Sequence, residues 1–201
     1  MRSMAQVGWP SLRVFIFGPL LFAVLVACGG GGENQADRPP WGLDSIVLPA
    51  DAESVIAVLQ GLPSDVGGLP RQPGVTLSAE TLLAAGRAEV KYDEERALTA
   101  GIGVITLNEI RSFAEDPEVT PVEFLGILAS SSEVEVEAEE LDPDEALAYV
   151  VSRETGNGRT VYTIAWAEPE GDWFFSASAH TPDVRRAMVE AFIQSVRAAS
   201  P

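Results

Sequence analysis

Four short β-rich runs in the C-terminal third constrain the fold of this chain more than any other feature. The turn signals "TGNG" and "PEG" separate the last three runs, so consecutive runs are expected to pair as an antiparallel meander. The run "VYTIAWA" is apolar on both of its faces, as expected for a strand that helices cover from both sides. The four predicted strands occupy residues 132–141, 145–154, 159–168 and 172–180.

The chain closes with a predicted amphipathic helix over residues 181–199. Thr181 is the expected N-cap and Pro182 the first helical residue. The residues expected on its buried stripe are Val184, Met188, Ala191, Phe192 and Val196.

The N-terminal half adds helices and two further strands. Strands are predicted at 88–93 and 96–107, and the glycines Gly101 and Gly103 suggest a bulge or close backbone packing in the second. Residues 64–74 are predicted to form a loop, and helices are predicted at 51–63, 78–87 and 120–130. The fold class is therefore α+β, with an antiparallel sheet of about six strands covered by helices. The order lacks βαβ alternation and phosphate-loop glycines, which disfavours a Rossmann-like sheet.

One stretch carries a family resemblance. The "WFFSASA" strand leading into "AMVEAFIQSVRAA" resembles actinobacterial-type lipoproteins of the Mog1/PsbP-like superfamily. The resemblance spans residues 87–199 and rests on the pattern of elements. It implies an α+β sandwich with a binding or accessory role. Members mostly lack conserved catalytic residues, so the resemblance assigns none here.

Residues 1–27 have the order of a secretory signal. Arg2 and Arg13 precede an uncharged apolar run over residues 14–27. As a helix that run would cover about 21 Å, less than a bilayer core of about 30 Å, and Pro19 interrupts it. A permanent transmembrane anchor is therefore the weaker interpretation.

The sequence Leu25-Val26-Ala27-Cys28 resembles a bacterial lipobox. The resemblance implies cleavage before Cys28 and a diacylglyceryl group on its sulfur; the alternative is an ordinary signal peptide with an incidental cysteine. Residues 28–40 read as a flexible Gly-rich tether, and residues 41–201 as a single α+β domain. The expected location is the extracytoplasmic face of the cell membrane. Residue 29 is Gly and not the Asp that resembles an inner-membrane retention signal. If the cell has an outer membrane, the sequence therefore does not keep the protein from reaching it.

Charge and composition narrow the possible partners. The formal net charge is −17, and loss of Arg2 and Arg13 with the signal makes it more negative. Such a surface repels phosphate backbones, so no nucleic-acid partner is expected. The chain has one histidine and one cysteine. A zinc or copper site within one chain is therefore disfavoured, and no metal or other cofactor is expected.

The histidine is the first candidate for chemistry. Strand alternation places His180 on one face with Ser176 and Ser178, and a Ser-His pair can form a nucleophile. Residues two apart on a strand are about 6–7 Å apart, and no sharp turn presents either serine. A structural role is therefore favoured and no catalytic residue is predicted, with Ser176, Ser178 and His180 as the alternative.

The acidic strand is the second candidate. Alternation predicts Glu133, Glu135, Glu137 and Glu139 on one face and Val134, Val136 and Ala138 on the other, with Asp142 and Asp144 following. Carboxylates bind Ca²⁺, but four along one strand face spread over about 20 Å. The favoured interpretation is a solvated edge strand whose charges protect it against pairing with another strand. Such a strand should tolerate Glu135→Gln and Glu137→Gln.

The aromatic residues Tyr162, Trp166, Trp173 and Phe175 are interpreted as sheet core, with an aromatic ligand groove as the alternative. The function that these observations favour is a membrane-tethered, extracytoplasmic accessory lipoprotein that binds a partner protein or envelope component without catalysis. The two alternatives are a small envelope hydrolase with a Ser-His pair and an acidic Ca²⁺-responsive module.

Overall fold

The computed structural model describes residues 40–73, 76–92, 100–131, 134–141, 147–156 and 158–200. The predicted signal peptide and Cys28 lie outside the described residues, as does the predicted tether up to residue 39. Glu133, Asp142 and Asp144 of the acidic segment also lie outside them.

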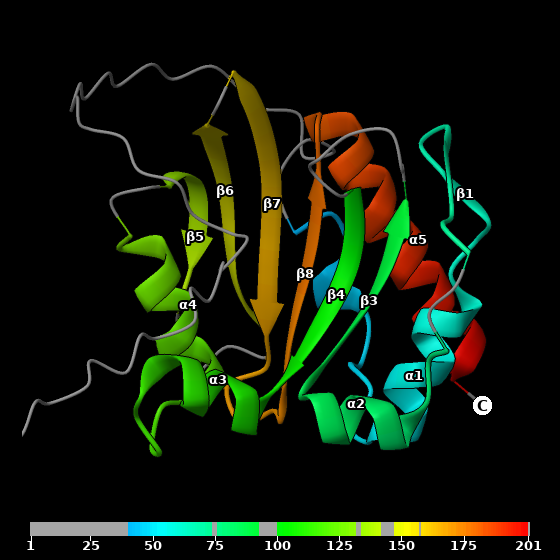
Figure 1. Cartoon of the computed structure of the whole chain (residues 1–201). Coiled ribbons are helices and arrows are strands. Elements are labelled where there is room, and N and C mark those ends of the chain that lie inside the picture. Colours follow the sequence, from blue (N-terminus) through cyan, green and yellow to red (C-terminus); the bar gives the residue numbers. More distant parts are fainter. Residues whose placement is uncertain are drawn as a thin grey trace, which may run out of the picture.

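A six-stranded antiparallel sheet forms the centre of the structure (Figure 1), which confirms the predicted α+β class. Its strand order is β3-β4-β8-β7-β6-β5. The last four strands in sequence form the predicted meander, and β8 then pairs with β4 to join it to the earlier hairpin. The strands are β3 (Arg87–Tyr92), β4 (Ala100–Thr106), β5 (Glu135–Glu140), β6 (Ala148–Gly156), β7 (Arg159–Ala167) and β8 (Trp173–Ala179).

Capped helices surround the sheet. Thr120 forms a capping box with Glu123, and the Thr181 side chain accepts a hydrogen bond from the Val184 backbone N–H, so both predicted caps are confirmed. None of the helices in the described ranges meets the length and hydropathy that a membrane span requires. The helices are α1 (Ala52–Gly61), α2 (Ala79–Ala85), α3 (Leu107–Ala114), α4 (Pro121–Ala129), α5 (Pro182–Ala199) and the 3₁₀ turn η2 (Leu43–Ser45).

The two faces of the sheet carry different helices (Figure 1). On one face α5 packs on β4, β7 and β8, and α1 packs on α5. The rings of Trp166, Phe175 and Phe192 meet there with centroids 5.1–5.8 Å apart. On the other face α3 and α4 form a second core, in which Phe124 meets Phe174 edge-on at 5.3 Å. Apolar residues on both faces of β7 are thereby explained.

Two local predictions are wrong. The sequence predicts that the second strand runs to Leu107, but Thr106 ends β4 and caps α3, a helix that the sequence pattern does not indicate. The predicted loop 64–74 contains a short hairpin, β1 (Asp65–Val66) and β2 (Leu69–Pro70). Gly67 and Gly68 between them have φ values of +61° and +80°, as a two-residue I′ turn requires.

The sequence offers two explanations for the glycines of β4, a bulge or close backbone packing, and the structure shows which of them holds at Gly101. The strand pairs continuously with β3 and β8, so it contains no bulge. A Cβ atom on Gly101 would lie 2.7 Å from the Val90 carbonyl oxygen. Close backbone approach therefore accounts for this glycine.

Candidate functional site

Ser176 and Ser178 lie on the predicted common face of β8, the face covered in part by α3 and α4. Ser176 is opposite Ala165 of β7, which belongs to the core beneath these helices. The Ser178 hydroxyl is 2.9 Å from the Thr163 hydroxyl on the neighbouring strand. His180 follows the end of β8 and is half-buried. Ser178 thus has a hydrogen-bonding partner other than the histidine.

The backbone around these serines is also unlike that of an exposed nucleophile. Both lie within a continuous strand that is hydrogen-bonded to β4 on one side and β7 on the other. A serine nucleophile of the α/β-hydrolase type instead occupies a sharp strand-to-helix turn. The arrangement fits hydroxyls that pack within a sheet better than it fits an activated Ser-His pair.

The acidic strand β5 does not have the predicted strict alternation. Its register with β6 shifts between Val136 and Ala138, which makes Glu137 the extra residue of a β-bulge. As a result, Val136 packs against the core under α4, whereas Ala138 packs against the opposite core under α5. The prediction that all the valine and alanine side chains share one face, and all the glutamates the other, is therefore wrong.

The bulge directs Glu137 toward α5, where its carboxylate accepts a 3.0 Å hydrogen bond from Arg185 Nη1. The Arg185 side chain is only 4% exposed, so a carboxylate partner is needed to balance its charge. Its guanidinium also lies over the Trp41 and Tyr162 rings, at 5.2 and 5.7 Å from their centroids. Sequence reasoning missed this residue, although its spacing from Met188, Val189 and Phe192 placed a charge on the buried stripe of α5.

A second arginine engages the same strand from β6. Arg153 forms an ion pair with Glu135, and the hydrogen bond and charge of that carboxylate raise the pKa of Arg153. Glu135 and Glu137 are both exposed, as predicted for a solvated strand, but each also has an arginine partner. Fewer carboxylates are left for a cation, which weighs against the Ca²⁺ module.

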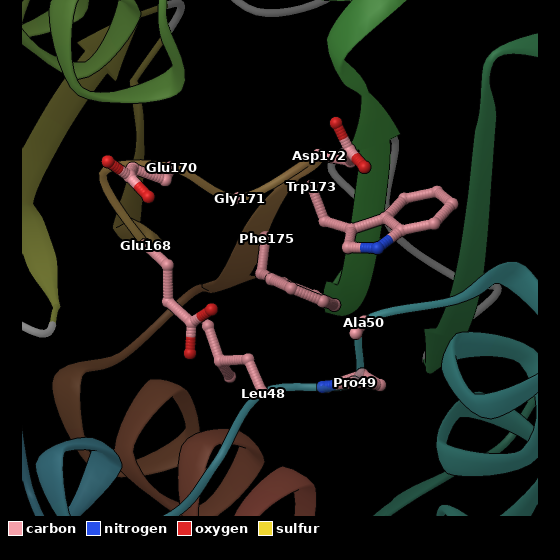
Figure 2. A pocket seen from close by; sticks show the side chains of 9 residues that line it. All are labelled: Leu48, Pro49, Ala50, Glu168, Glu170, Gly171, Asp172, Trp173 and Phe175. Carbon is pink, nitrogen blue, oxygen red and sulfur yellow. The ribbon is translucent and has the colours of Figure 1, made fainter.

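A pocket of about 130 Å³ lies between residues 48–50 and the turn that connects β7 to β8. Leu48 and Phe175 give it apolar walls, and Trp173 lies at its edge. Figure 2 shows the Glu168 side chain extending toward Leu48 from one side and the Trp173 indole nitrogen facing the pocket from the other. The carboxylates of Glu170 and Asp172 point away from it (Figure 2).

Three of the four aromatic residues predicted as core lie in the core or at the pocket, whereas Tyr162 is only half-buried and contacts the Arg185 guanidinium. Trp166 and Phe175 are fully enclosed in the core, as predicted. Trp173 is 7% exposed and lines the pocket together with Phe175. The sequence signal for this pocket was the cluster of aromatic residues, which had raised a ligand groove as the alternative to core.

Within the described part of the chain, no group of three or more His, Cys, Asp or Glu residues is arranged to hold a metal ion. Comparison with known proteins found no matching family model, no matching curated protein and no matching solved structure.

Proposed function

We propose that this protein is a lipid-anchored, extracytoplasmic accessory lipoprotein whose α+β domain binds a partner protein or an envelope component. The observation that carries the proposal is the position of Cys28 at the end of the apolar run, directly after Leu25-Val26-Ala27. Two or more acyl chains hold a protein stably at a membrane, because each buried methylene contributes about 0.8 kcal/mol.

The domain supports a binding role more than a catalytic one. Ser176 and Ser178 are built into a continuous strand, and the Ser178 hydroxyl pairs with Thr163. Large apolar side chains remain exposed on the surface, including Phe113 at 41% and Ile127 at 50% on α3 and α4. Such side chains are suitable contacts for a partner, and a tether raises the local concentration of the domain at a membrane-associated target.

The sheet covered by helices on both faces also fits a Mog1/PsbP-like sandwich. We include that family in the proposal on the strength of the β8–α5 pattern, where "WFFSASA" leads into an 18-residue helix.

Metabolic labelling with radioactive palmitate tests the anchor. The wild-type chain is expected to incorporate label and to fractionate with membranes, and Cys28→Ser is expected to lose both properties. Gly30→Ser changes a residue just beyond the lipobox and is the matched control, expected to behave as the wild type. A Cys28→Ser protein that is processed normally and stays at the membrane would refute the proposal.

In-cell crosslinking of the tagged protein tests the binding role. A specific crosslinked species should persist in His180→Ala and Ser178→Ala, because the proposed role does not use a nucleophile. Replacing Phe113 or Ile127 with Ser identifies whether α3 or α4 contributes to the contact. Hydrolytic activity that His180→Ala abolishes in a folded protein would instead favour the envelope hydrolase.

A further inference from the structure

The indole nitrogen of Trp173 is a buried hydrogen-bond donor without a partner. Trp173 is 7% exposed, and its Nε1 has no hydrogen-bond acceptor among the described residues. Leaving a buried donor unpaired costs about 1–3 kcal/mol, so native structures leave few of them. Trp166 Nε1 is in the same state, but Trp166 belongs to the central core and does not line the pocket.

The Trp173 indole nitrogen faces the pocket but is itself buried, so a ligand's acceptor reaches it when Trp173 or the facing segment 48–50 shifts. The pocket it lines has a volume of about 130 Å³, close to that of cavities that hold a benzene-sized molecule and larger than the space of one water. Residues 48–50, which line one side of it, belong to no helix or strand.

The opposite wall determines the charge of that ligand. The half-buried Glu168 side chain extends along the pocket toward Leu48 (Figure 2), where a carboxylate favours a cationic donor. The formal net charge of −17 disfavours anions throughout. Leu48 and Phe175 between the two polar groups favour a short aliphatic segment.

We propose that this pocket, which lies between residues 48–50 and the β7–β8 turn, binds a small aliphatic amine that also carries an acceptor oxygen. The ammonium group is bound by Glu168, and the oxygen accepts a hydrogen bond from Trp173 Nε1. The inference goes beyond the proposed function, since it does not depend on the lipid anchor or on a protein partner.

Nuclear magnetic resonance of the indole N–H groups tests the site. The sample is the ¹⁵N-labelled full chain carrying Cys28→Ser, titrated with glycinamide, which has an ammonium group and a carbonyl oxygen. We expect a saturable downfield shift of the Trp173 indole resonance, with a dissociation constant on the order of 1 mM for so small a ligand. Trp173→Phe assigns the resonance, and Trp166 provides an internal control that should not shift.

Charge variants on both sides of the complex complete the test. N-acetylglycinamide lacks the ammonium charge and should bind at least about tenfold more weakly, as should glycinamide to Glu168→Gln. Glu170→Gln is the matched control, because its carboxylate points away from the pocket, and it should bind normally. The proposal is overturned if the Trp173 resonance does not shift, if Trp166 shifts equally, or if Glu168→Gln leaves the affinity unchanged in a protein with a native spectrum.

Glycyl-glycinamide distinguishes two sources of the same chemistry. Weaker binding than glycinamide assigns the pocket to a free amine. Tighter binding assigns it to the N-terminus of a peptide, with the same ammonium and acceptor groups. A wild-type chain that incorporates no palmitate would refute the lipid anchor, but it would not affect the ligand titration. Failures of the two proposals are therefore distinguishable.

Discussion

Arg185 and Glu137, which are 48 positions apart in the sequence, form an ion pair with a 3.0 Å contact that joins α5 to the bulge of β5. Arg185 Nη1 also lies 3.4 Å from the carbonyl oxygens of Ser152 and Thr163. One side chain thus connects α5 with three neighbouring strands. Its guanidinium also contacts the Trp41 ring, which precedes the first helical turn, η2.

Glu137→Gln should destabilise the domain by about 1–3 kcal/mol, because it removes the negative partner of a buried cation. Glu139→Gln is the matched control on the same strand: this glutamate is exposed like Glu137 but does not contact Arg185, so the change should alter stability by no more than about 0.5 kcal/mol. Urea unfolding measures both. The structure therefore replaces the expectation that Glu137 tolerates this change, and equal stabilities for the two variants would show that the ion pair contributes little.

Phe192→Ala should cost about 3–5 kcal/mol of unfolding free energy, because it opens a cavity in the centre of the larger core. Phe192 is fully buried and its ring lies 5.1 Å from Trp166 and 5.3 Å from Phe175. Ile127→Ala, at a side chain that is 50% exposed, should cost less than about 1 kcal/mol. Chemical denaturation gives both values. A loss below about 1 kcal/mol for Phe192→Ala would mean that the core relaxes around the gap.

Gly86→Ala should destabilise the domain more than Gly158→Ala. Both glycines have a φ of +71°, so each alanine meets the same left-handed strain of about 1–2 kcal/mol. At Gly86 the new Cβ would also lie 2.8 Å from Glu109 Cβ, whereas no atom lies within 4 Å at Gly158. Thermal unfolding of the two variants separates backbone strain from the steric clash, and identical melting temperatures would exclude a clash.

Tyr92 should make stability fall at alkaline pH. Burial raises the pKa of Tyr92 above its ordinary value of 10.0, and its hydroxyl donates a 2.9 Å hydrogen bond to the Pro63 carbonyl oxygen. The unfolded chain then loses the tyrosine proton at a lower pH than the native one. The contribution is complete below about pH 10 and is lost as the pH rises toward the folded pKa.

Tyr92→Phe provides the comparison for this pH dependence. Unfolding free energies of the two proteins, measured between pH 8 and pH 11, should differ most at pH 8 and converge as the pH rises. The other tyrosines titrate in both proteins, so their contribution drops out of the difference between the two unfolding free energies. A difference that stays constant with pH would show that Tyr92 ionises equally in both states.

The sequence by itself determined the local elements, because their signals depend on nearby residues. Period-two runs and intervening turns placed six strands, and Thr120, Thr181 and Pro182 marked two helix starts within one residue. It also determined the α+β class. The four consecutive C-terminal runs with short turns between them predict an antiparallel meander, and the predicted helices lie outside that meander. The α3 helix was missed because it begins directly at the end of β4, where Thr106 serves both elements.

Only the tertiary structure decided the features that depend on distant partners. The pairing of β4 with β8, the bulge at Glu137 and the burial of Arg185 are all choices between surfaces far apart in the sequence. Alternation cannot reveal a bulge, because the extra residue becomes apparent only against the register of the neighbouring strand. The aromatic cluster in the sequence raises a ligand groove only as an alternative, because the wall that Leu48 contributes comes from a segment 120 residues before Glu168.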